Sequence, residues 1–242
     1  MTDPQTLSAR LPALILEEIR NGAFATCTRL PPEVELASHF DVSRNAIREA
    51  LIRMESEGMI YRRQGVGTLI NRYVVNAMPR LDLNYELETT IRSMGKTPSV
   101  PLIRTESILP DSTLIQTLEI PPDQPVLHST RVICIDSVPQ IYCEDFVSEH
   151  LIRTRRNQKK ALEKSIYEFL TECCDITIET DLVEIQSIRA PLEVSYALNL
   201  EKNTPILSLT EVGLSSHGKP ILFSNEYIVN RSLPQWIIRK KI

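Results

Sequence analysis

The chain has few of the residues that mark a disulfide framework, a metal site or a membrane segment. Of its 242 residues, five are cysteine, seven are glycine and only 5% are aromatic. An odd number of cysteines, without CxxC or Cys/His metal spacing, favours reduced thiols over disulfides or a bound metal. No apolar run approaches the ~20 residues needed to span a bilayer, and the first ten residues lack the basic and then apolar order of a signal peptide. We therefore expect a cytoplasmic protein without a metal, a cofactor or a membrane partner.

What is present indicates ordinary globular folding in more than one domain. The hydrophobic fraction is 42% and the charged fraction 24%, as in globular proteins. A chain of 242 residues is long enough for two domains.

The stretch 30–70 carries the clearest local pattern in the chain. Two prolines favour the start of a short helix, which we predict over 33–40. After a turn, Ser43 is a good N-cap for a second helix, because its hydroxyl can accept an otherwise unpaired backbone N–H. Gly58 ends the second helix. The apolar stripe of this helix consists of Ile47, Ala50, Leu51 and Met54.

A β-hairpin is predicted directly after the second helix. Two short apolar-bearing runs, 59–63 and 68–70, flank a loop that contains Gly65 and Gly67. Two helices joined by a tight turn and followed by such a hairpin form a winged helix-turn-helix, a DNA-binding motif. The alternative is an ordinary helix pair followed by a hairpin. The candidate DNA-binding residues are Ser43, Arg44, Asn45, Arg48, Arg62, Arg63, Gly65 and Gly67.

The affinity of this region for DNA depends on which face of its surface carries the positive charges, and not on its net charge. The chain has a formal net charge of −4, and residues 1–76 hold as many acids as arginines. On the second helix Arg44 and Arg48 are one turn apart, whereas Glu55 and Glu57 lie at the far end. We therefore expect one basic face and a modest nonspecific affinity for DNA.

The same stretch resembles the DNA-binding domain of the GntR family of bacterial transcription regulators. The matching residues are Leu30-Pro31, Glu33, Leu36-Ala37, Val42-Ser43-Arg44, Arg48-Glu49-Ala50-Leu51, Glu57-Gly58 and Gly65-x-Gly67-Thr68. The resemblance implies that Arg44 and Arg48 read the major groove of double-stranded DNA and that the wing glycines approach the minor groove. Cys27, Pro32 and Val34 depart from the family pattern, which leaves the operator sequence open.

These patterns divide the chain into a DNA-binding domain at 1–72, a linker at 73–82 and a second domain at 83–242. A first helix, predicted over 6–21, should pack on the helix pair. Since one helix-turn-helix contacts about one half-site, we expect a homodimer, formed through the second domain, on a palindromic operator.

The second domain contains an internal repeat. Residues 125–132 align with 205–212, and residues 139–147 align with 220–228. Each unit is predicted to contain a helix, a strand, a short helix and a hairpin, in that order. Six strands joined mainly by hairpins predict an α+β (mixed α/β) fold: an antiparallel sheet of pseudo-two-fold symmetry, with helices packed on one face. The predicted segments are 83–94, 99–109, 111–118 and 125–135 with 140–148 in the first unit, and 165–173, 177–189, 192–199 and 205–214 with 221–229 in the second.

This order of elements resembles the UTRA effector domain of the HutC subfamily of GntR regulators, which has a chorismate lyase-like fold. The resemblance covers residues 83–240 and implies a small-molecule effector. In UTRA domains that bind phosphorylated sugars, the third strand shows Arg-x-Arg. Here Arg131 matches the first arginine and Ile133 replaces the second, while the family's sugar-binding glutamates match Cys143 and Leu222.

An anionic group is the effector chemistry that these residues favour. Arg131 can bind a phosphate or carboxylate in bidentate fashion, and the helix that opens at Ser165 can accept an anion at its N-terminus. Two alternatives stay open: Arg131 pairs with a cross-strand acid such as Glu144 or Glu211, and Ser165 is a simple N-cap. The candidate effector-binding residues are Arg131, Cys143, Glu144, Ser165, Tyr167, Leu222 and Tyr227.

We therefore predict a DNA-binding transcription regulator, with repression as the expected direction and activation left open. An enzyme on the lyase-like fold and a pure dimerisation module are the alternatives. The four histidines lie away from any Ser or Cys nucleophile motif, and an enzyme has no use for a fused helix-turn-helix.

Overall fold

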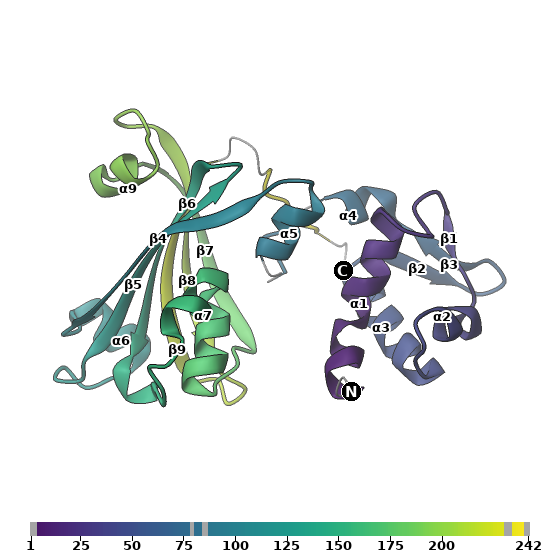
Figure 1. Cartoon of the computed structure of the whole chain (residues 1–242), viewed down its shortest axis with the longest axis horizontal. Helices are drawn as coiled ribbons and strands as arrows, with labels where there is room; N and C mark the ends of the chain where they lie inside the picture. The colour runs from purple at the N-terminus through teal and green to yellow at the C-terminus, as the bar shows by residue number, and fades with distance from the viewer. Residues whose placement is uncertain (1–3, 78–79, 84–86, 230–233, 240–242) are drawn as a thin grey trace. The chain divides into compact units, whose positions relative to one another are not determined.

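The computed structural model describes residues 4–77, 80–83, 87–229 and 234–239, and the chain folds into two compact units (Figure 1). The first unit is 1–84 with 235–242, and the second is 85–234. The sequence patterns assign the last segment to the second domain, and the structure differs. Trp236 forms a β-bridge with Arg80, and its carbonyl accepts the N–H of Leu81 at 2.8 Å.

The first unit is a winged helix-turn-helix. Its strands form a small antiparallel sheet in the order β1-β3-β2. The predicted apolar stripe of α3 is buried and packs toward α1. The sequence patterns did not predict the strand β1, which is two residues long. The elements are α1 Pro4–Arg20, β1 Arg29–Leu30, α2 Glu33–His39, α3 Arg44–Ser56, β2 Ile60–Arg63, β3 Gly67–Ile70 and α4 Arg72–Asn76.

The segment expected as a linker begins with the helix α4. Val74 and Val75 of this helix are buried, and α4 contacts α1. Arg20 donates two hydrogen bonds to the Val75 carbonyl, at 3.0 and 2.7 Å. Residues 72–76 are therefore part of the first unit's packed structure.

The second unit is one six-stranded antiparallel sheet with short helices. Its strand order is β4-β5-β6-β9-β8-β7, so the sheet has β4 and β7 as its edges. This is the order that the predicted repeat would produce; the repeat itself stays a prediction. The elements are α5 Leu87–Ser93, β4 Pro98–Ile108, α6 Ser112–Leu118, β5 Val126–Ile135, β6 Val138–Ser148, η1 Glu149–Leu151, α7 Gln158–Lys164, α8 Ile166–Phe169, η2 Leu170–Cys174, β7 Thr180–Arg189, α9 Leu192–Ala197, β8 Pro205–Leu214 and β9 Pro220–Ile228.

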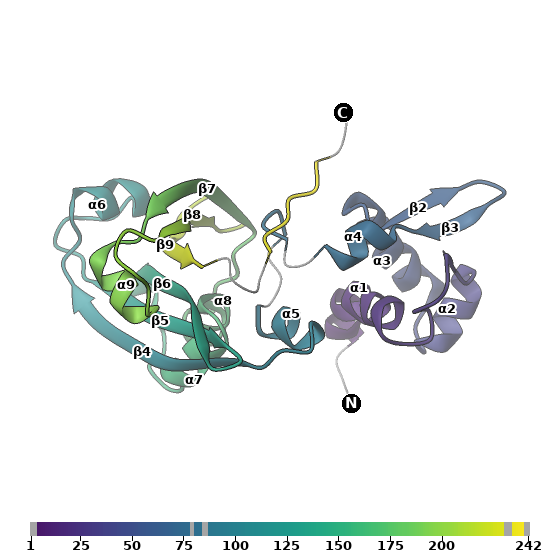
Figure 2. The ribbon, with the colours of Figure 1, turned by 90° about the horizontal axis from the view of Figure 1, so that it is seen from above.

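Helices cover both faces of the sheet, so the prediction of helices on one face is wrong (Figures 1 and 2). On the first face α7 and α8 pack on Leu127, Val147 and Leu222. On the other face α6 packs against Val126, and α9 packs against Tyr142. Because neighbouring residues of a strand point to opposite faces, a residue's position along its strand decides which helices it meets.

Candidate DNA-binding surface and effector site

The start of α3 is fixed by a side-chain cap. The Ser43 hydroxyl accepts the backbone N–H of Ala46 at 3.1 Å, so the predicted N-cap is confirmed. Ile47, Leu51 and Met54 bury the opposite side of the helix. The cap and the buried stripe together hold the first turn of α3 with Arg44 and Asn45 exposed to solvent.

The arginines of this surface differ in whether their side chains already have ion-pair partners within the protein. Within the described part of the chain, the side chains of Arg44 and Arg63 have no polar partner, and both residues are exposed. Arg48 instead lies 3.4 Å from Glu33. The guanidinium of Arg62 donates to Glu55 at 2.9 Å and lies 4.0 Å from Glu33. Arg44 and Arg63 can therefore meet a phosphate or a base edge without first breaking an internal contact.

The wing depends on two glycines with positive φ. Gly65 has a φ of 76° and Gly67 a φ of 100°, a region that other residues rarely adopt. Apart from the glycine and its two chain neighbours, no described residue has an atom within 4 Å of where a Cβ would be at Gly65 or Gly67, so the need for glycine comes from the backbone conformation. Arg29 of β1 donates a hydrogen bond to the Val66 carbonyl at 3.2 Å and so connects the tip of the wing to β1. The sequence patterns did not identify Arg29.

Arg131 is a buried ion-pair partner in the second unit. It is 3% exposed, and its Nε and Nη2 lie 3.0 and 2.9 Å from the Asp145 carboxylate. Its Nη1 lies 3.5 Å from the Leu162 carbonyl of α7, and the Ser224 hydroxyl donates to the same Asp145 at 2.8 Å. The pairing alternative therefore describes Arg131, with Asp145 in place of the expected Glu144 or Glu211.

Two carboxylates outside the predicted effector-binding set, Glu211 and Glu226, lie near this pair. Glu226 accepts a contact from the Cys143 thiol at 3.8 Å, and the Tyr167 side chain hydrogen-bonds Glu211. Burial and the neighbouring Glu226 raise the pKa of Glu211 to about 9, and burial together with Asp145 raises the pKa of Glu226. This part of the α7–α8 face is therefore rich in carboxyl groups that can hydrogen-bond hydroxyl or amino groups.

Glu144 and Tyr227 lie on the opposite face from Arg131, so the structure does not bring the predicted effector residues together. Glu144 lies 3.5 Å from His128, whose ring stacks on Phe146. The Tyr227 ring lies 6.0 Å from the Tyr142 ring. Glu144 follows Cys143 directly, and this step of one residue turns the side chain to the other face.

The remaining predicted effector residues have mixed surroundings. The Ser165 hydroxyl accepts the Glu168 N–H at 3.0 Å, which is the N-cap alternative. Leu222 is fully buried in the core between the sheet and the helices α7 and α8. Tyr167 is half-buried on α8. Of these three residues, Tyr167 alone has a side chain that reaches the carboxylate cluster by hydrogen bonding, through Glu211.

An open recess of about 330 Å³ lies between α5, the start of β4 and α7. Ile133, at the position where the resemblance implied a second arginine, lines it together with Ile91 and Val100. Two lysines, Lys160 and Lys164, line the recess together with two glutamates, Glu88 and Glu163, and the Lys164 ammonium is already engaged by Glu168 at 2.6 Å. The recess is therefore less cationic than a phosphate site with two arginines.

The residues that the structure describes contain no metal site, no membrane-spanning helix and no disulfide. There, no group of three or more His, Cys, Asp or Glu side chains could hold a metal ion. No helix among those residues has the length and apolar character needed to cross a bilayer. All five cysteines are free thiols.

Comparison with known proteins gives two family matches. The UTRA domain matches residues 93–232, and the bacterial regulatory proteins of the gntR family match residues 7–70. The transcriptional repressor NagR of Bacillus subtilis is 24% identical over 205 residues, which cover 83% of this chain and 81% of the relative. The regulator GmuR of the same species is 25% identical over 207 residues, covering 85% and 86%. The crystal structure of the possible regulator YydK of B. subtilis superposes with a TM-score of 0.75 at 18% identity, covering 98% and 100%, and supports the fold alone.

Proposed function

Since the chain belongs to the GntR-type transcription regulators that carry a UTRA domain, we propose that it is a homodimeric repressor with a palindromic operator in double-stranded DNA. It is a transcription regulator rather than an enzyme. A regulator of this kind works where the DNA is, so the proposal includes the cytoplasm as its location.

The exposed start of α3 is the observation that carries the DNA-binding assignment. Arg44 and Asn45 are exposed there, on a helix that its cap and its buried stripe hold rigid. Arginine can bind a guanine edge in bidentate fashion, and asparagine can do the same with adenine. We assign base contacts to Arg44, Asn45 and Arg48, and phosphate contacts to Ser43, Arg62 and Arg63, with the close approach of the wing provided by Gly65 and Gly67.

We propose a dimer because one winged helix is too small to contact a whole operator. A single winged helix reads about one half-site, which gives too few contacts for tight and specific binding. A two-fold dimer places two such helices on inverted half-sites.

Selection from randomised duplex DNA tests this assignment. The full chain is incubated with the library, and the bound fraction is sequenced after several rounds. The proposal expects an enriched motif of two inverted half-sites, bound with 1:1 stoichiometry of dimer to duplex. Enrichment of a single half-site would refute the dimer, and no enrichment at all would refute sequence-specific binding.

We assign the effector to the α7–α8 face of the six-stranded sheet. The recess lined by Ile91, Val100 and Ile133 supports a ligand with an apolar part. Glu211 and Glu226 lie on the same face of the sheet but outside the recess, and their carboxyl groups support hydroxyl or amino donors on the ligand. We do not assign an anion to the space between Arg131 and Ser165, because both groups already have partners.

An effector acts on DNA affinity only through its different affinity for the two states of the regulator. A metabolite library screened by thermal shift on the full chain should yield a compound that stabilises it. The same compound should weaken binding to the selected operator. A compound that stabilises the chain and leaves operator affinity unchanged would contradict the coupling.

A further inference from the structure

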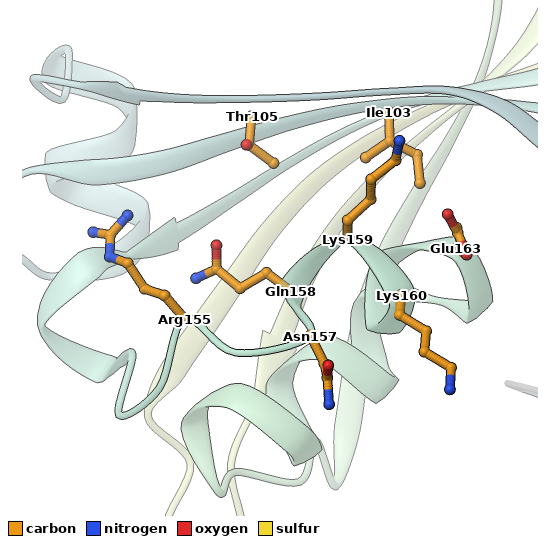
Figure 3. A pocket seen from close by; sticks show the side chains of 8 residues that line it. All are labelled: Ile103, Thr105, Arg155, Asn157, Gln158, Lys159, Lys160 and Glu163. Carbon is orange, nitrogen blue, oxygen red and sulfur yellow. The ribbon is translucent and has the colours of Figure 1, made fainter.

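Arg80, in the first unit, is a charged side chain that the fold buries. Lysines and arginines normally keep their charge in water. Lys159 and Lys160 do so at the groove between β4 and α7, where Lys160 points away from the strand (Figure 3). Arg80 is instead 5% exposed. Because a buried charge is costly unless partners satisfy it, the contacts of Arg80 identify what this residue holds together.

The guanidinium of Arg80 binds a carboxylate and the end of a helix. Its Nε donates to Asp82 at 3.1 Å, and its Nη2 donates to the other oxygen of the same carboxylate. Its Nη1 donates to the backbone carbonyl of Glu57 at 2.7 Å. Glu57 is the C-cap of α3, where helix carbonyls lack partners within the helix and a cation complements the helix dipole. Arg80 therefore holds the C-terminal end of α3, as Ser43 caps its N-terminal end.

The backbone next to this guanidinium pairs with a segment close to the end of the chain. Trp236 forms a β-bridge with Arg80, and its carbonyl accepts the N–H of Leu81 at 2.8 Å. The Ile238 N–H donates to Asp82 at 3.4 Å. We call these two paired segments the clasp, 80–82 with 236–238. All of its contacts lie within the first unit.

Both chain connections between the two units lead into the clasp. The chain leaves the first unit after residue 84 and returns to it at residue 235. The next element described after the clasp is α5, whose Leu87 and Ile91 line the recess that supports the effector site. The last strand before the chain returns is β9, which carries Glu226. Any displacement that the covalent chain transmits from the second unit to α3 therefore passes through the clasp.

We propose that Arg80 is a positioning residue through which the second unit acts on α3. A shift of either chain connection moves the clasp, and Arg80 carries this movement to the end of the helix whose first turn presents Arg44. The proposal rests on the effector coupling proposed above and adds the residue that transmits it. Since coupling between two sites is reciprocal, DNA bound at α3 should in turn change the clasp and α5.

The chain's single tryptophan lies in the clasp and provides a probe that needs no effector. Trp236 is 46% exposed, so its emission responds to a change in its contact with water. The full chain is titrated with the selected operator duplex, and anisotropy of a labelled duplex follows binding in a parallel series. We expect a saturable shift of the Trp236 emission with the same midpoint as the anisotropy. Amide hydrogen exchange in α5 should change at saturation, and a scrambled duplex at the same concentration should cause neither effect.

Arg80→Lys tests whether the guanidinium transmits this response. A lysine keeps the charge, but its single ammonium cannot replace the planar group that binds the carboxylate and the carbonyl together. The α5 exchange response to the operator should therefore be lost. Asp82→Asn, at a side chain 28% exposed, provides a milder second variant and should weaken the response. The matched control is Arg53→Lys, at the same end of α3, where Arg53 pairs with the Glu57 side chain at 3.1 Å; it should keep the wild-type response.

Operator binding that leaves both the Trp236 emission and the α5 exchange unchanged would overturn the proposal and leave the DNA-binding assignment intact. Absence of operator binding in the anisotropy series would instead refute the DNA-binding assignment. A full α5 response in Arg80→Lys would also overturn the proposal, because Arg80 would then be only a structural cap of α3. The wild-type titration alone can refute the proposal, so the test does not depend on the folding of any variant.

Discussion

Arg44 on α3 and Arg131 on β5 are the same residue type in opposite surroundings. Arg44 is exposed and has no polar partner in the described structure, whereas Arg131 is 3% exposed and held by Asp145. A charge in water can stay unpaired until a ligand arrives, but a buried charge needs a partner within the fold. The first unit thus keeps its arginine available for an external anion, and the second unit uses its arginine internally.

The largest expected effect follows from removing Arg131. Arg131→Ala leaves Asp145 buried without its cation, and breaking one side of a buried pair costs about 3–5 kcal/mol. The free energy of unfolding, measured by urea denaturation with circular dichroism, should fall by that amount.

Arg92→Ala provides the matched control. Arg92 forms an i,i+4 pair with Glu88 at 2.7 Å, and its side chain is 58% exposed. Its loss should change the free energy of unfolding by less than about 1 kcal/mol. Equal effects of the two substitutions would show that the Arg131–Asp145 pair does not hold the fold.

The second prediction concerns the exposed arginine. Arg44→Ala should weaken binding to the selected operator by about 1–3 kcal/mol, the usual contribution of a bidentate base contact. Fluorescence anisotropy on a labelled duplex measures this change. Arg53→Ala is the control, since Arg53 lies at the other end of α3 and pairs with Glu57. A footprint and an affinity unchanged in Arg44→Ala would remove α3 from the interface.

The wing offers a smaller comparison between two adjacent arginines. Arg63 is exposed without a partner among the described residues, whereas Glu55 holds Arg62. Each phosphate contact contributes about 0.9 to the slope of log affinity against log salt concentration. Arg63→Ala should lower that slope by about this amount on every sequence, and Arg62→Ala should lower it less. Equal effects of the two substitutions would show that the contact with Glu55 does not hold Arg62 back, and an unchanged slope in both would refute the phosphate contacts of the wing.

The smallest effect is a pH dependence at His128. The carboxylate of Glu144, 3.5 Å from Nε2, raises the pKa of His128 above 6.5, and Glu106 at 3.0 Å from Nδ1 adds to this. A raised pKa in the folded state means that the charged ring stabilises the fold fully below the unfolded value and loses this contribution as the pH rises through the folded value. The wild type should therefore exceed His128→Gln in unfolding free energy by more at about pH 6 than at about pH 9. A difference that stays constant with pH would exclude the His128–Glu144 contact as its source.

The sequence predicted the winged helix well because its signals are local. The cap at Ser43, the stripe on α3 and the wing glycines each act within a few residues. The strand β1 escaped prediction, because its two residues are defined only by pairing with β3, distant in sequence. The helix α7 was missed as well, since its two buried residues, Ala161 and Leu162, are too few to give a periodic pattern.

The six strands were predicted from alternation, but the faces on which their residues lie were not. Most residues of β5 are buried, because helices cover both faces of the sheet. The pattern alone therefore could not show which side chains meet. The predicted effector-binding set included Tyr227, while its neighbour Glu226 is the residue that lies on the side of Arg131. Strand alternation between Ser224 and Glu226 was the signal that could have identified it.

The most direct test of the contrast between the exposed Arg44 and the buried Arg131 uses the Arg44→Ala variant. Operator affinity and the free energy of unfolding are measured on the same preparation. An arginine held available for DNA should cost the fold nothing when it is removed. The account predicts at least a ~10-fold loss of operator affinity with a free energy of unfolding within about 0.5 kcal/mol of the wild type. Wild-type operator affinity, or a loss of stability comparable to that of Arg131→Ala, would contradict it.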